Sequence, residues 1–502
     1  MTPKSHSQHH HRGLLRAQNS NAMPEGDRAL AAELRAAIGP DRVRTDGAQR
    51  SLVARDASTT PPGAVGPVCL VDSTEEVQAV MRISRSHGRH IVPRGAGTGL
   101  SGGAVPLGAP VVVSTARMNR ILSVDLDARI AWVEPGVVNL DLSRHLRPLG
   151  FHFAPDPSSQ QVCTIGGNVA NNSGGPHCLS EGVTNQHVVA VEVVLPDGEV
   201  VVLGGEEGFT RGLDLRGVFV GSEGTMGIAT RIAVVLTPNA PAVRTLLLAF
   251  ATVDGAARAV SAIIAAGIVP AALEVLDRLC VNAVEDYVHA GYPRDAAAVL
   301  LAEVEGLEDG VVIDARRIAE IGAAHGATSV RHAHDEQERE LLWKGRKTAF
   351  GATARIASRY YLHDTVIPRA KLAEVLDAVT RIAEKYELPV MNVFHAGDGN
   401  LHPLLLFDGD DAETLERVHA AGAEIIRVSL AAGGSLSGEH GIGLEKQPFM
   451  AEMFSADNLD QQEHIRRAFD PECRSNPGKV LPTGHSCADI QALQAVPSGV
   501  WG

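Results

Sequence analysis

Two histidines frame a short glycine-rich turn in the run FHAGDGNLH, residues 394–402. Residues typical of strands enter and leave its Gly-Asp-Gly turn, so we expect a tight β-hairpin that carries His395 and His402 at adjacent positions on its two arms. A second glycine-rich segment, residues 438–441, contains Glu439. Two imidazoles and one carboxylate form a metal site that leaves coordination positions open for a substrate, which is typical of a catalytic metal. The alternative is a pair of hairpin histidines satisfied by hydrogen bonds.

The length of 502 residues, with 44% hydrophobic and 21% charged residues, predicts a soluble globular protein of two or three domains that can bury a large cofactor. The formal net charge of -14 argues against nucleic-acid binding, because no basic excess is present to neutralise phosphates. No apolar run approaches the roughly 18 to 20 residues of a membrane span, so any membrane association is expected to be peripheral or through a partner.

The cysteines, at residues 69, 163, 178, 280, 473 and 487, form no C-x-x-C pair, so neither an iron–sulfur cluster nor a structural zinc site is predicted. We expect reduced thiols in a cytoplasmic enzyme, with peripheral association at the inner face of the membrane as an alternative. Residues 1–22 contain no hydrophobic segment that would mark a secretory signal. Residues 1–23 are expected to form a disordered extension, and residues 483–502 a loose tail.

The pattern of apolar residues predicts an α+β protein with a first domain at residues 24–241 and a second at residues 242–482. In the first, helices are expected at 25–38 and 73–87, and strands at 67–71, 91–93, 111–114, 130–135, 188–195, 200–203 and 228–236. Ser73 and Glu76 form a capping box for the second helix. The second domain is expected to be an antiparallel sheet with helices on one side. Its elements are a strand at 245–251 and helices at 255–266, 335–355, 369–387 and 412–432.

A glycine-rich loop, PRGAGTGLSGG at residues 93–103, follows a predicted strand and contains the spacing G-x-G-x-x-G. In a dinucleotide-binding Rossmann turn this spacing opens a helix, but Pro106, Gly108 and Pro110 exclude that helix here. The loop also lacks the Lys-Ser/Thr end of a P-loop. Its unshielded backbone amides can instead wrap a pyrophosphate. The alternative is a flexible loop without a ligand.

Two further loops of small and amide residues occur in the same domain. One runs from PDPSS at 155–159 into TIGGNVANNSGG at 164–175, and the other is GSEGTMGI at 221–228. Small residues let a backbone approach a flat ligand, and amide side chains can bind its polar edges. Three such loops in one domain favour a bound cofactor.

The three loops in this order, followed by FHAGDGNLH, GEHG and the NPGK of residues 476–479, resemble the FAD-dependent D-2-hydroxyacid dehydrogenases, which have the vanillyl-alcohol oxidase/para-cresol methylhydroxylase fold. The similarity covers about residues 30–482. Within the family the chain most resembles the FAD-binding subunit of bacterial glycolate oxidase, with the D-lactate dehydrogenases next. The resemblance implies an FAD-binding domain of two α+β subdomains at 24–241. It also implies a C-terminal FAD-linked oxidase domain, with an antiparallel sheet flanked by helices, at 242–482.

The resemblance also implies which residues bind FAD. The pyrophosphate is expected at Arg94, Gly95, Ala96, Gly97, Thr98, Gly99, Gly102 and Gly103, the flavin at Pro157, Ser158, Ser159, Gly166, Gly167, Asn168, Asn171, Asn172, Ser173, Gly174, Gly175 and Asn476, and the adenosine half at Gly227 and Ile228. Covalent members of the family attach FAD through a histidine or cysteine near these loops. Residues 94–103 contain neither, so we expect non-covalent FAD, with His177 and Cys178 as the alternative attachment residues.

For the chemistry, the resemblance implies oxidation of a short 2-hydroxy acid to the 2-oxo acid, with hydride passing to flavin N5. His395, His402 and Glu439 resemble the metal ligands of the family, with zinc expected and manganese or iron open, and a metal would stabilise the developing alkoxide. His440 is suited to act as general base, because imidazole changes charge near neutral pH. Arg346 matches the arginine that binds the substrate carboxylate. The alternative is a solvent-exposed helix arginine, the position we expect for Lys344 and Lys347.

Relatives that act on a dicarboxylate carry polar contacts at positions that align with Leu404 and Leu362, so a second carboxylate would be left unpaired here. Glycolate or D-lactate is the expected substrate. No Rossmann unit is predicted, so electrons are expected to pass to a quinone or to a partner such as an iron–sulfur subunit, and a homodimer is also considered. The alternatives are a non-catalytic FAD-binding electron-transfer subunit, which would lose the metal ligands, and an FAD-dependent ether-lipid synthase, which would need a long acyl channel.

Overall fold

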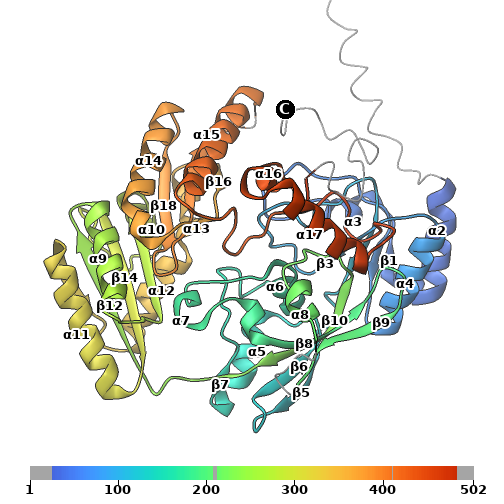
Figure 1. The fold of residues 1–502 in the computed structure, drawn as a ribbon, viewed down its shortest axis with the longest axis horizontal. Coiled ribbons are helices and arrows are strands. Elements are labelled where there is room, and N and C mark those ends of the chain that lie inside the picture. The colour runs from blue at the N-terminus through green and yellow to red at the C-terminus, as the bar shows by residue number, and fades with distance from the viewer. Residues whose placement is uncertain (1–24, 207–211, 410, 483–502) are drawn as a thin grey trace, which may run out of the picture.

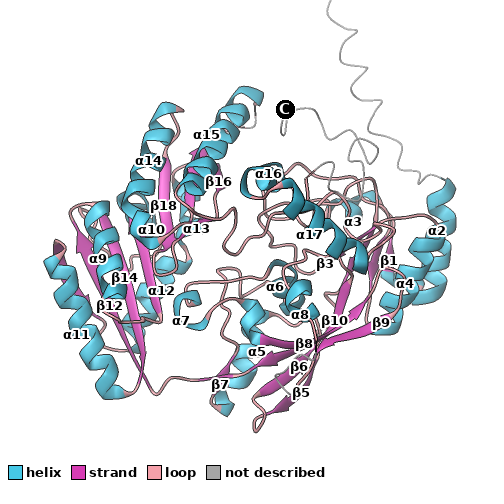
Figure 2. Ribbon diagram, viewed as in Figure 1, coloured by secondary structure: helices cyan, strands magenta, loops and turns pink. Residues whose placement is uncertain are grey.

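The structure is a computed structural model that describes residues 25–206, 212–409 and 411–482 (Figure 1 and Figure 2). The extension and the tail expected at residues 1–23 and 483–502 lie outside these ranges. Helices and strands are mixed throughout these ranges, which confirms the predicted α+β class. The first part of the chain forms two main sheets and the second part forms one large sheet. The domain boundary near residue 241 stays a prediction.

The first sheet leads the chain into the first glycine-rich loop. Its order is β1 (Val43–Arg44), β2 (Val68–Leu70), β4 (Val111–Ser114) and β3 (Ile91–Arg94), with the last three parallel. Helices α2 (Glu25–Ile38) and α4 (Thr74–Ser86) cover it through a shared apolar core. Ser73 caps α4 by accepting a hydrogen bond from the Glu76 N–H, as predicted, and Glu76 Oε2 in turn accepts one from the Asp72 N–H.

The second sheet is antiparallel and supports the other two loops. Its order is β5 (Ile121–Asp125), β6 (Ile130–Val133), β10 (Ile228–Val235), β8 (Val188–Val194) and β9 (Val200–Gly204). Helices α5 (Asn139–Leu146), α6 (Ile165–Asn171) and α8 (Leu215–Phe219) bury apolar residues against it, and β7 (Phe151–His152) pairs with β11 (Thr237–Pro238). The sequence pattern missed β5, because the residues of this edge strand are mostly exposed.

The second part of the chain is built on one large antiparallel sheet. Its strands are β12 (Ala242–Phe250), β13 (Ala272–Asp277), β14 (Ala298–Gly306), β15 (Ala327–His332), β16 (Arg359–Leu362), β17 (Thr365–Val366), β18 (Val390–His395), β19 (Asn400–Leu401) and β20 (Pro403–Phe407). The main order is β15-β12-β14-β13-β18-β19-β17, and β20 joins β16 to β18. All of these pairings are antiparallel, as predicted.

Helices flank this sheet as predicted, but they cover both faces rather than one. The two sets are α9 (Val253–Ala265), α11 (Glu308–Ala324), α14 (Leu372–Lys385) and α15 (Ala412–Ala431) on one face, and α10 (Arg278–Tyr287), α12 (Glu336–Lys347) and α13 (Ala349–Ala352) on the other. In β12, Leu246 and Leu248 belong to the first core, whereas Leu247 and Ala249 belong to the second. Because successive side chains of a strand point to opposite faces, a strand that is apolar at every position requires cover on both sides.

The single helix expected over residues 335–355 is divided in the structure. α12 ends at Lys347, and the separate helix α13 begins at Ala349. Between them, the Thr348 hydroxyl donates a hydrogen bond to the Lys344 carbonyl. A side-chain hydroxyl that bonds to a backbone carbonyl offers an alternative to the regular helix, which accounts for a break that apolar spacing alone does not reveal.

The end of the described chain returns to the first part, where α16 (Met450–Met453) and α17 (Ala456–Phe469) appear in red in Figure 1. Ser475 forms a parallel bridge with Ile91 of β3, and its hydroxyl donates to the Gly224 carbonyl. The last residues therefore brace the loops that surround both small sheets.

The prediction of reduced thiols needs one correction. Cys69, Cys163, Cys178 and Cys280 are free, but Cys473 is disulfide-bonded. Across residues 25–206, 212–409 and 411–482, no helix combines the length and the apolar character that crossing a membrane requires.

Replacing Leu248 with alanine should destabilise the second part of the chain. Leu248 is fully buried and packs against Gly322 of α11, so the lost contacts and the remaining cavity should cost about 2–5 kcal/mol of unfolding free energy. Equilibrium denaturation followed by tryptophan fluorescence measures this change. Leu307→Ala is the control, because Leu307 is 77% exposed and its loss should cost less than about 0.5 kcal/mol. Equal losses in the two variants would contradict this core.

Candidate functional site

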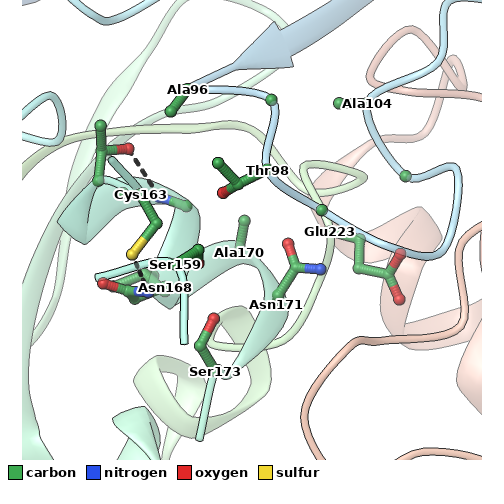
Figure 3. A pocket seen from close by; sticks show the side chains of 18 of the residues that line it. Ala96, Thr98, Ala104, Ser159, Cys163, Asn168, Ala170, Asn171, Ser173 and Glu223 are labelled. Carbon is green, nitrogen blue, oxygen red and sulfur yellow. Dashed lines mark hydrogen bonds between the residues drawn. The ribbon is translucent and has the colours of Figure 1, made fainter. Parts of the chain in front are cut away.

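A cavity of about 410 Å³ lies between the two parts of the chain. Its walls are the glycine-rich loop after β3, helix α6 with the residues before it, the segment that leads into β10, and residues of α12, α13, β16 and the 438–441 loop. Figure 3 shows Ala96 and Thr98 of the first loop across the hollow from Asn168 of α6. The three glycine-rich loops predicted from the sequence therefore meet at one place.

Most residues predicted to bind FAD line this cavity. They are Arg94, Gly95, Ala96, Gly97, Thr98, Gly99, Gly103, Pro157, Ser158, Ser159, Gly166, Gly167, Asn168, Asn171, Ser173, Gly227 and Ile228. The predicted residues outside its lining are Gly102, Asn172, Gly174, Gly175 and Asn476.

Two of the residues outside the lining support the loops instead. Asn476 Nδ2 donates to the carbonyls of Gly103 and Glu223, which ties the end of the chain to the first loop. Asn172 ends α6 in the left-handed conformation and accepts a hydrogen bond from the Asn185 N–H. The structure thus places these two amides behind the cavity, where they fix the backbone that lines it.

Glycine is favoured at two positions of the cavity lining. Gly97 has φ +75°, a left-handed backbone conformation that other residues rarely adopt. A Cβ at Gly166 would lie 2.6 Å from Pro135 Cβ. Residues 95–110 contain no helix or strand, as their prolines predict, so the first loop is not a Rossmann turn.

The hairpin that carries the paired histidines forms as predicted. β18 ends at His395, which pairs with Asn400 of β19, and Asn392 pairs with Pro403 of β20. This register puts His402 diagonally across from His395, and their ring centroids are 5.0 Å apart.

Hydrogen bonds fix the orientation of both rings. His395 Nδ1 lies 2.8 Å from Glu274 Oε1, and His402 Nδ1 lies 3.0 Å from the carbonyl oxygen of His363. Each acceptor holds a proton on Nδ1, which leaves Nε2 to bind a metal when the ring is neutral. Both Nε2 atoms point to Glu439. The Glu439 Oε1 atom lies 3.5 Å from His395 Nε2 and 3.2 Å from His402 Nε2.

A buried carboxylate positions the loop that carries Glu439. Asp364 accepts hydrogen bonds from three successive N–H groups, those of residues 438–440. Lys446 Nζ lies 2.7 Å from Asp364 Oδ2. Burial raises the pKa of the Asp364 carboxyl, but the Lys446 ammonium, His440 and His402 together outweigh it and hold this pKa well below its usual range. The ionised carboxylate thereby fixes an irregular loop at a defined distance from the hairpin.

His395, His402 and Glu439 form a group that could hold a metal ion. Their ligand atoms all lie within 4.8 Å of one another. Among the described residues, His402 Nε2 and Glu439 Oε2 are buried without a hydrogen-bond partner, which is costly unless a ligand completes them. Burial raises the pKa of Glu439, but the three histidines around it, His395, His402 and His440, lower this pKa well below its usual range, so the carboxylate is charged. Two imidazole nitrogens and one carboxylate fit a divalent transition metal.

His440 lies between this cluster and the cavity. Its ring stacks on that of His402, with centroids 5.1 Å apart and planes 7° apart, and its Nε2 lies 3.5 Å from Glu439 Oε1. It also lines the cavity, and its carbonyl accepts a hydrogen bond from Asn171 Nδ2. His440 therefore contacts both the metal-ligand cluster and a loop predicted to bind the flavin.

Arg346 is buried, which excludes the alternative of a solvent-exposed helix arginine. Its Nε donates a hydrogen bond of 2.5 Å to Glu274 Oε2, and its Nη1 is buried with no partner among the residues that the structure describes. Arg346 lies outside the cavity lining. Lys344 and Lys347 are both exposed, as expected, and Lys347 also lines the mouth of the cavity.

Two buried ion pairs attach α12 to the sheet. Arg339 Nε lies 3.0 Å from Glu303 Oε2, and Trp343 Nε1 donates to the same oxygen. Two turns after Arg339 along α12, Arg346 pairs with Glu274. The register of β13 and β14 puts Glu303 diagonally next to Glu274 on one face of the sheet. The helix is thus held by two neighbouring carboxylates.

The two apolar positions that bear on substrate size have different surroundings. Leu362 lines the cavity together with Phe350 and Tyr360. Leu404 is fully buried in the core and pairs with Leu362 across β16 and β20. Leu362 is therefore the one of the two that can contact a ligand directly.

His177 and Cys178, at the start of α7 (Cys178–Glu181), lie outside the cavity lining. Burial lowers the pKa of His177, but Asp156 and Glu303 on either side raise it to about 10. Burial raises the pKa of Cys178 well above its usual range. A charged imidazole and a protonated thiol are poor nucleophiles.

Several charged residues that shape the site were not predicted: Glu223, Glu274, Glu303, Asp364 and Lys446. Glu274 and Glu303 stand in the otherwise apolar strands ALEVLD and AVLLAEVEG, and a charge in a buried strand is a signal for a partner. Burial raises the pKa of Glu223 to about 7, although its oxygens accept hydrogen bonds from the N–H groups of Ile442 and Gly443. No sequence pattern marked Asp364 or Lys446.

Among solved structures, p-cresol methylhydroxylase with substrate bound has a TM-score of 0.78 at 18% sequence identity, and the match covers 92% of this chain and 98% of that chain. At this identity the likeness shows the fold alone, and it confirms the predicted vanillyl-alcohol oxidase/para-cresol methylhydroxylase fold.

Family and sequence comparisons agree with this fold. Residues 67–204 match the family described as FAD binding domain, and residues 239–480 match FAD linked oxidases, C-terminal domain. The glycolate oxidase subunit GlcD of Escherichia coli (strain K12) is 46% identical over 426 residues, which cover 85% of each chain. The D-lactate dehydrogenase of Anaerostipes hadrus is 32% identical over 429 residues, which cover 83% of this chain and 90% of that enzyme. The chain therefore belongs to the family of FAD-linked oxidases that includes both of these proteins.

Proposed function

We propose that this protein is an FAD-dependent dehydrogenase that oxidises a short 2-hydroxy acid, glycolate or D-lactate, to the 2-oxo acid. One observation carries the proposal: the cavity lined by the FAD loops is also lined by Glu439 and His440, next to His395 and His402. A substrate in this cavity would lie between a hydride acceptor and groups that can hold its hydroxyl proton. The similarity to a glycolate oxidase subunit and to a D-lactate dehydrogenase supports these two substrates.

The cavity suits FAD without a covalent bond. FAD, when bound, supplies the acceptor for the hydride that leaves the substrate. Gly97 and Gly166 leave backbone groups, rather than side chains, against the cofactor. His177 and Cys178, the alternative attachment residues, lie outside the lining and are poor nucleophiles.

We further propose a divalent metal ion at His395, His402 and Glu439, with zinc as the expected ion and manganese or iron as alternatives. Such an ion would supply Lewis-acid stabilisation of negative charge on the substrate hydroxyl oxygen. The chain itself contributes the preorganisation. Glu274 and the His363 carbonyl orient the two rings, and Asp364 holds the loop that presents Glu439.

His440 is the proposed general base. Its Nε2 lies near Glu439, and its Nδ1 lies 4.0 Å from Asp364 Oδ2, so two carboxylates would stabilise the imidazolium formed when the ring takes the hydroxyl proton. Arg346 is proposed to bind the substrate carboxylate through its Nη1 atom, since its Nε is already bonded to Glu274. Lys347, which lines the cavity, is the second cation available to that carboxylate.

The lining favours a short substrate. Phe350, Tyr360 and Leu362 form the cavity wall contributed by α13 and β16. Leu362 offers no hydrogen bond to a second carboxylate, so D-2-hydroxyglutarate would leave that group unpaired in a buried site. Glycolate and D-lactate avoid this cost.

Electrons are proposed to leave the reduced flavin for a quinone or for a partner subunit that carries iron–sulfur clusters. The name of the relative, a glycolate oxidase subunit, supports a partner. We also propose that the enzyme is cytoplasmic, alone or at the inner face of the membrane, and that it forms a homodimer.

Acid denaturation should release the flavin if it is bound non-covalently. His177 and Cys178 are poorly suited to attack the cofactor, so precipitation with acid should leave a yellow supernatant and a colourless pellet. Flavin absorbance of both fractions measures the result. A pellet that keeps the flavin after washing in denaturant would contradict non-covalent binding.

A panel of D- and L-2-hydroxy acids is added anaerobically to the protein. Glycolate or D-lactate should bleach the flavin absorbance. His402→Ala should abolish bleaching while the protein keeps FAD, because the change removes a metal-ligand atom but no residue of the cavity lining. His332→Ala, at an exposed position of β15, is the control. Equally fast bleaching in His402→Ala would refute the metal site, and a parent protein that no 2-hydroxy acid bleaches would refute the function.

Arg346→Lys should raise the KM for D-lactate. A lysine keeps the charge but loses the planar fork and the bond from Nε to Glu274, which should cost about 10–100-fold in KM, equivalent to about 1.5–3 kcal/mol. Steady-state turnover with an artificial electron acceptor measures KM and kcat separately. Lys344→Met is the exposed control and should change neither. A KM that rises in Lys347→Met but not in Arg346→Lys would transfer the role to Lys347.

A further inference from the structure

Glu274 lies between His395, a proposed metal ligand, and Arg346, the arginine proposed to bind the substrate carboxylate. It is on β13 directly opposite His395 of β18, and it is fully buried. Its Oε1 lies 2.8 Å from His395 Nδ1, and its Oε2 accepts a hydrogen bond of 2.5 Å from Arg346 Nε. One carboxylate therefore contacts both the proposed metal ligand His395 and the proposed substrate-binding Arg346.

At His395 the carboxylate decides which nitrogen is available. A proton held on Nδ1 by Glu274 leaves Nε2 free on the side of Glu439, and a charged acceptor on Nδ1 makes the ring a better electron donor. His402 obtains its orientation from a neutral acceptor, the His363 carbonyl. Of the two hairpin histidines, His395 is thus the one whose acceptor is charged.

At Arg346 the same carboxylate decides which donors remain. The bond from Nε uses one edge of the guanidinium, and Nη2 lies 3.5 Å from His395 Nδ1, so Nη1 is the group left for another anion. Nη1 is buried and has no partner within the described ranges. A second anion at Nη1, such as a substrate carboxylate, would complete the hydrogen bonds of this side chain.

We infer that Glu274 is a positioning residue that couples metal retention to binding of the substrate carboxylate. The inference rests on the proposed function, because it concerns the same metal and the same substrate. A single carboxylate serves both partners, one through each oxygen. Removal of its charge should weaken both sites together, although Glu274 itself lines no part of the cavity.

Glu274→Gln keeps the size of the side chain but cannot serve both partners. An amide offers one acceptor oxygen and one donor group, so either His395 Nδ1–H or Arg346 Nε–H faces another donor. Loss of the group that orients a metal-ligating histidine lowers metal affinity about 10–100-fold. We expect this loss for Zn²⁺, measured by competition with a chromophoric chelator on full-length FAD protein stripped of metal. KM for D-lactate should rise as well, with an unchanged FAD content.

Glu303→Gln is the matched control. Glu303 is also fully buried, lies diagonally next to Glu274, and pairs with an arginine of the same helix, Arg339. The recorded contacts of its carboxylate include neither His395 nor Arg346. The Zn²⁺ affinity of Glu303→Gln and its KM for D-lactate should stay close to those of the parent protein.

A second variant covers the case in which Glu274→Gln fails to fold. A buried arginine that has lost its carboxylate is strongly destabilising, so Arg346→Met is added to Glu274→Gln to remove the unpaired cation. FAD content and near-UV circular dichroism report the folding of each variant. The double variant should bind Zn²⁺ as weakly as the single one, because His395 still lacks its carboxylate.

Parental Zn²⁺ affinity in the folded Glu274 variants would overturn the inference. An equal loss in Glu303→Gln would overturn it too, because the effect would then belong to any buried charge on this sheet. Failure of the proposed function gives a different result: no 2-hydroxy acid bleaches the parent flavin. The zinc measurements need no substrate, so the two failures are distinguishable.

Discussion

The candidate site depends on one buried carboxylate, that of Asp364, which collects three successive backbone N–H groups and the Lys446 ammonium. The loop it fixes has no regular secondary structure, so nothing else in the local backbone would set its conformation. Asn171 and Glu223 hold the residues that follow Glu439, and Asp364 bonds the Glu439 N–H itself. The hairpin positions two imidazoles through sheet register, and Asp364 positions the Glu439 carboxylate through charge and hydrogen bonds. The geometry of these candidate metal ligands therefore depends on an electrostatic contact between segments that are remote in sequence.

The large sheet explains how so many charges can be buried. Its strands are apolar on both faces, and helices cover both faces. Glu274 and Glu303, which are buried in this interior, therefore form ion pairs. Glu303 pairs with Arg339, and Glu274 pairs with Arg346 and His395. Exchanging such pairs for apolar residues is often neutral or stabilising, whereas breaking one is costly. The presence of the Glu274 pair beside the cavity is therefore better explained by orientation of His395 and Arg346 than by stability.

Much of the site could be predicted from the sequence where the signal was local. The histidine hairpin and the loops after β3 and before α6 depend on glycine and turn residues within a few positions, and the structure brings them together. The remainder depends on tertiary contacts. Glu274 gave a signal, a charge in an apolar strand, but its two partners lie 72 and 121 residues away. The helix break at Thr348 follows from a hydrogen bond of its hydroxyl, and apolar spacing alone predicts one long helix there. The helices on the second face of the sheet follow from strands that are buried on both sides, and the spacing of apolar residues did not reveal that second covered face.

The return of the chain end to the first glycine-rich loop has a consequence for biosynthesis. Asn476 donates to the Gly103 carbonyl across 373 positions of sequence, and Lys479 donates to the carbonyl of Gly102 in the same loop. The peptide groups that would cradle the pyrophosphate thus gain these supports only after residues 476–479 have been synthesised. A nascent polypeptide that ends before them lacks both bonds, so cofactor uptake is expected to follow synthesis of residues 242–479.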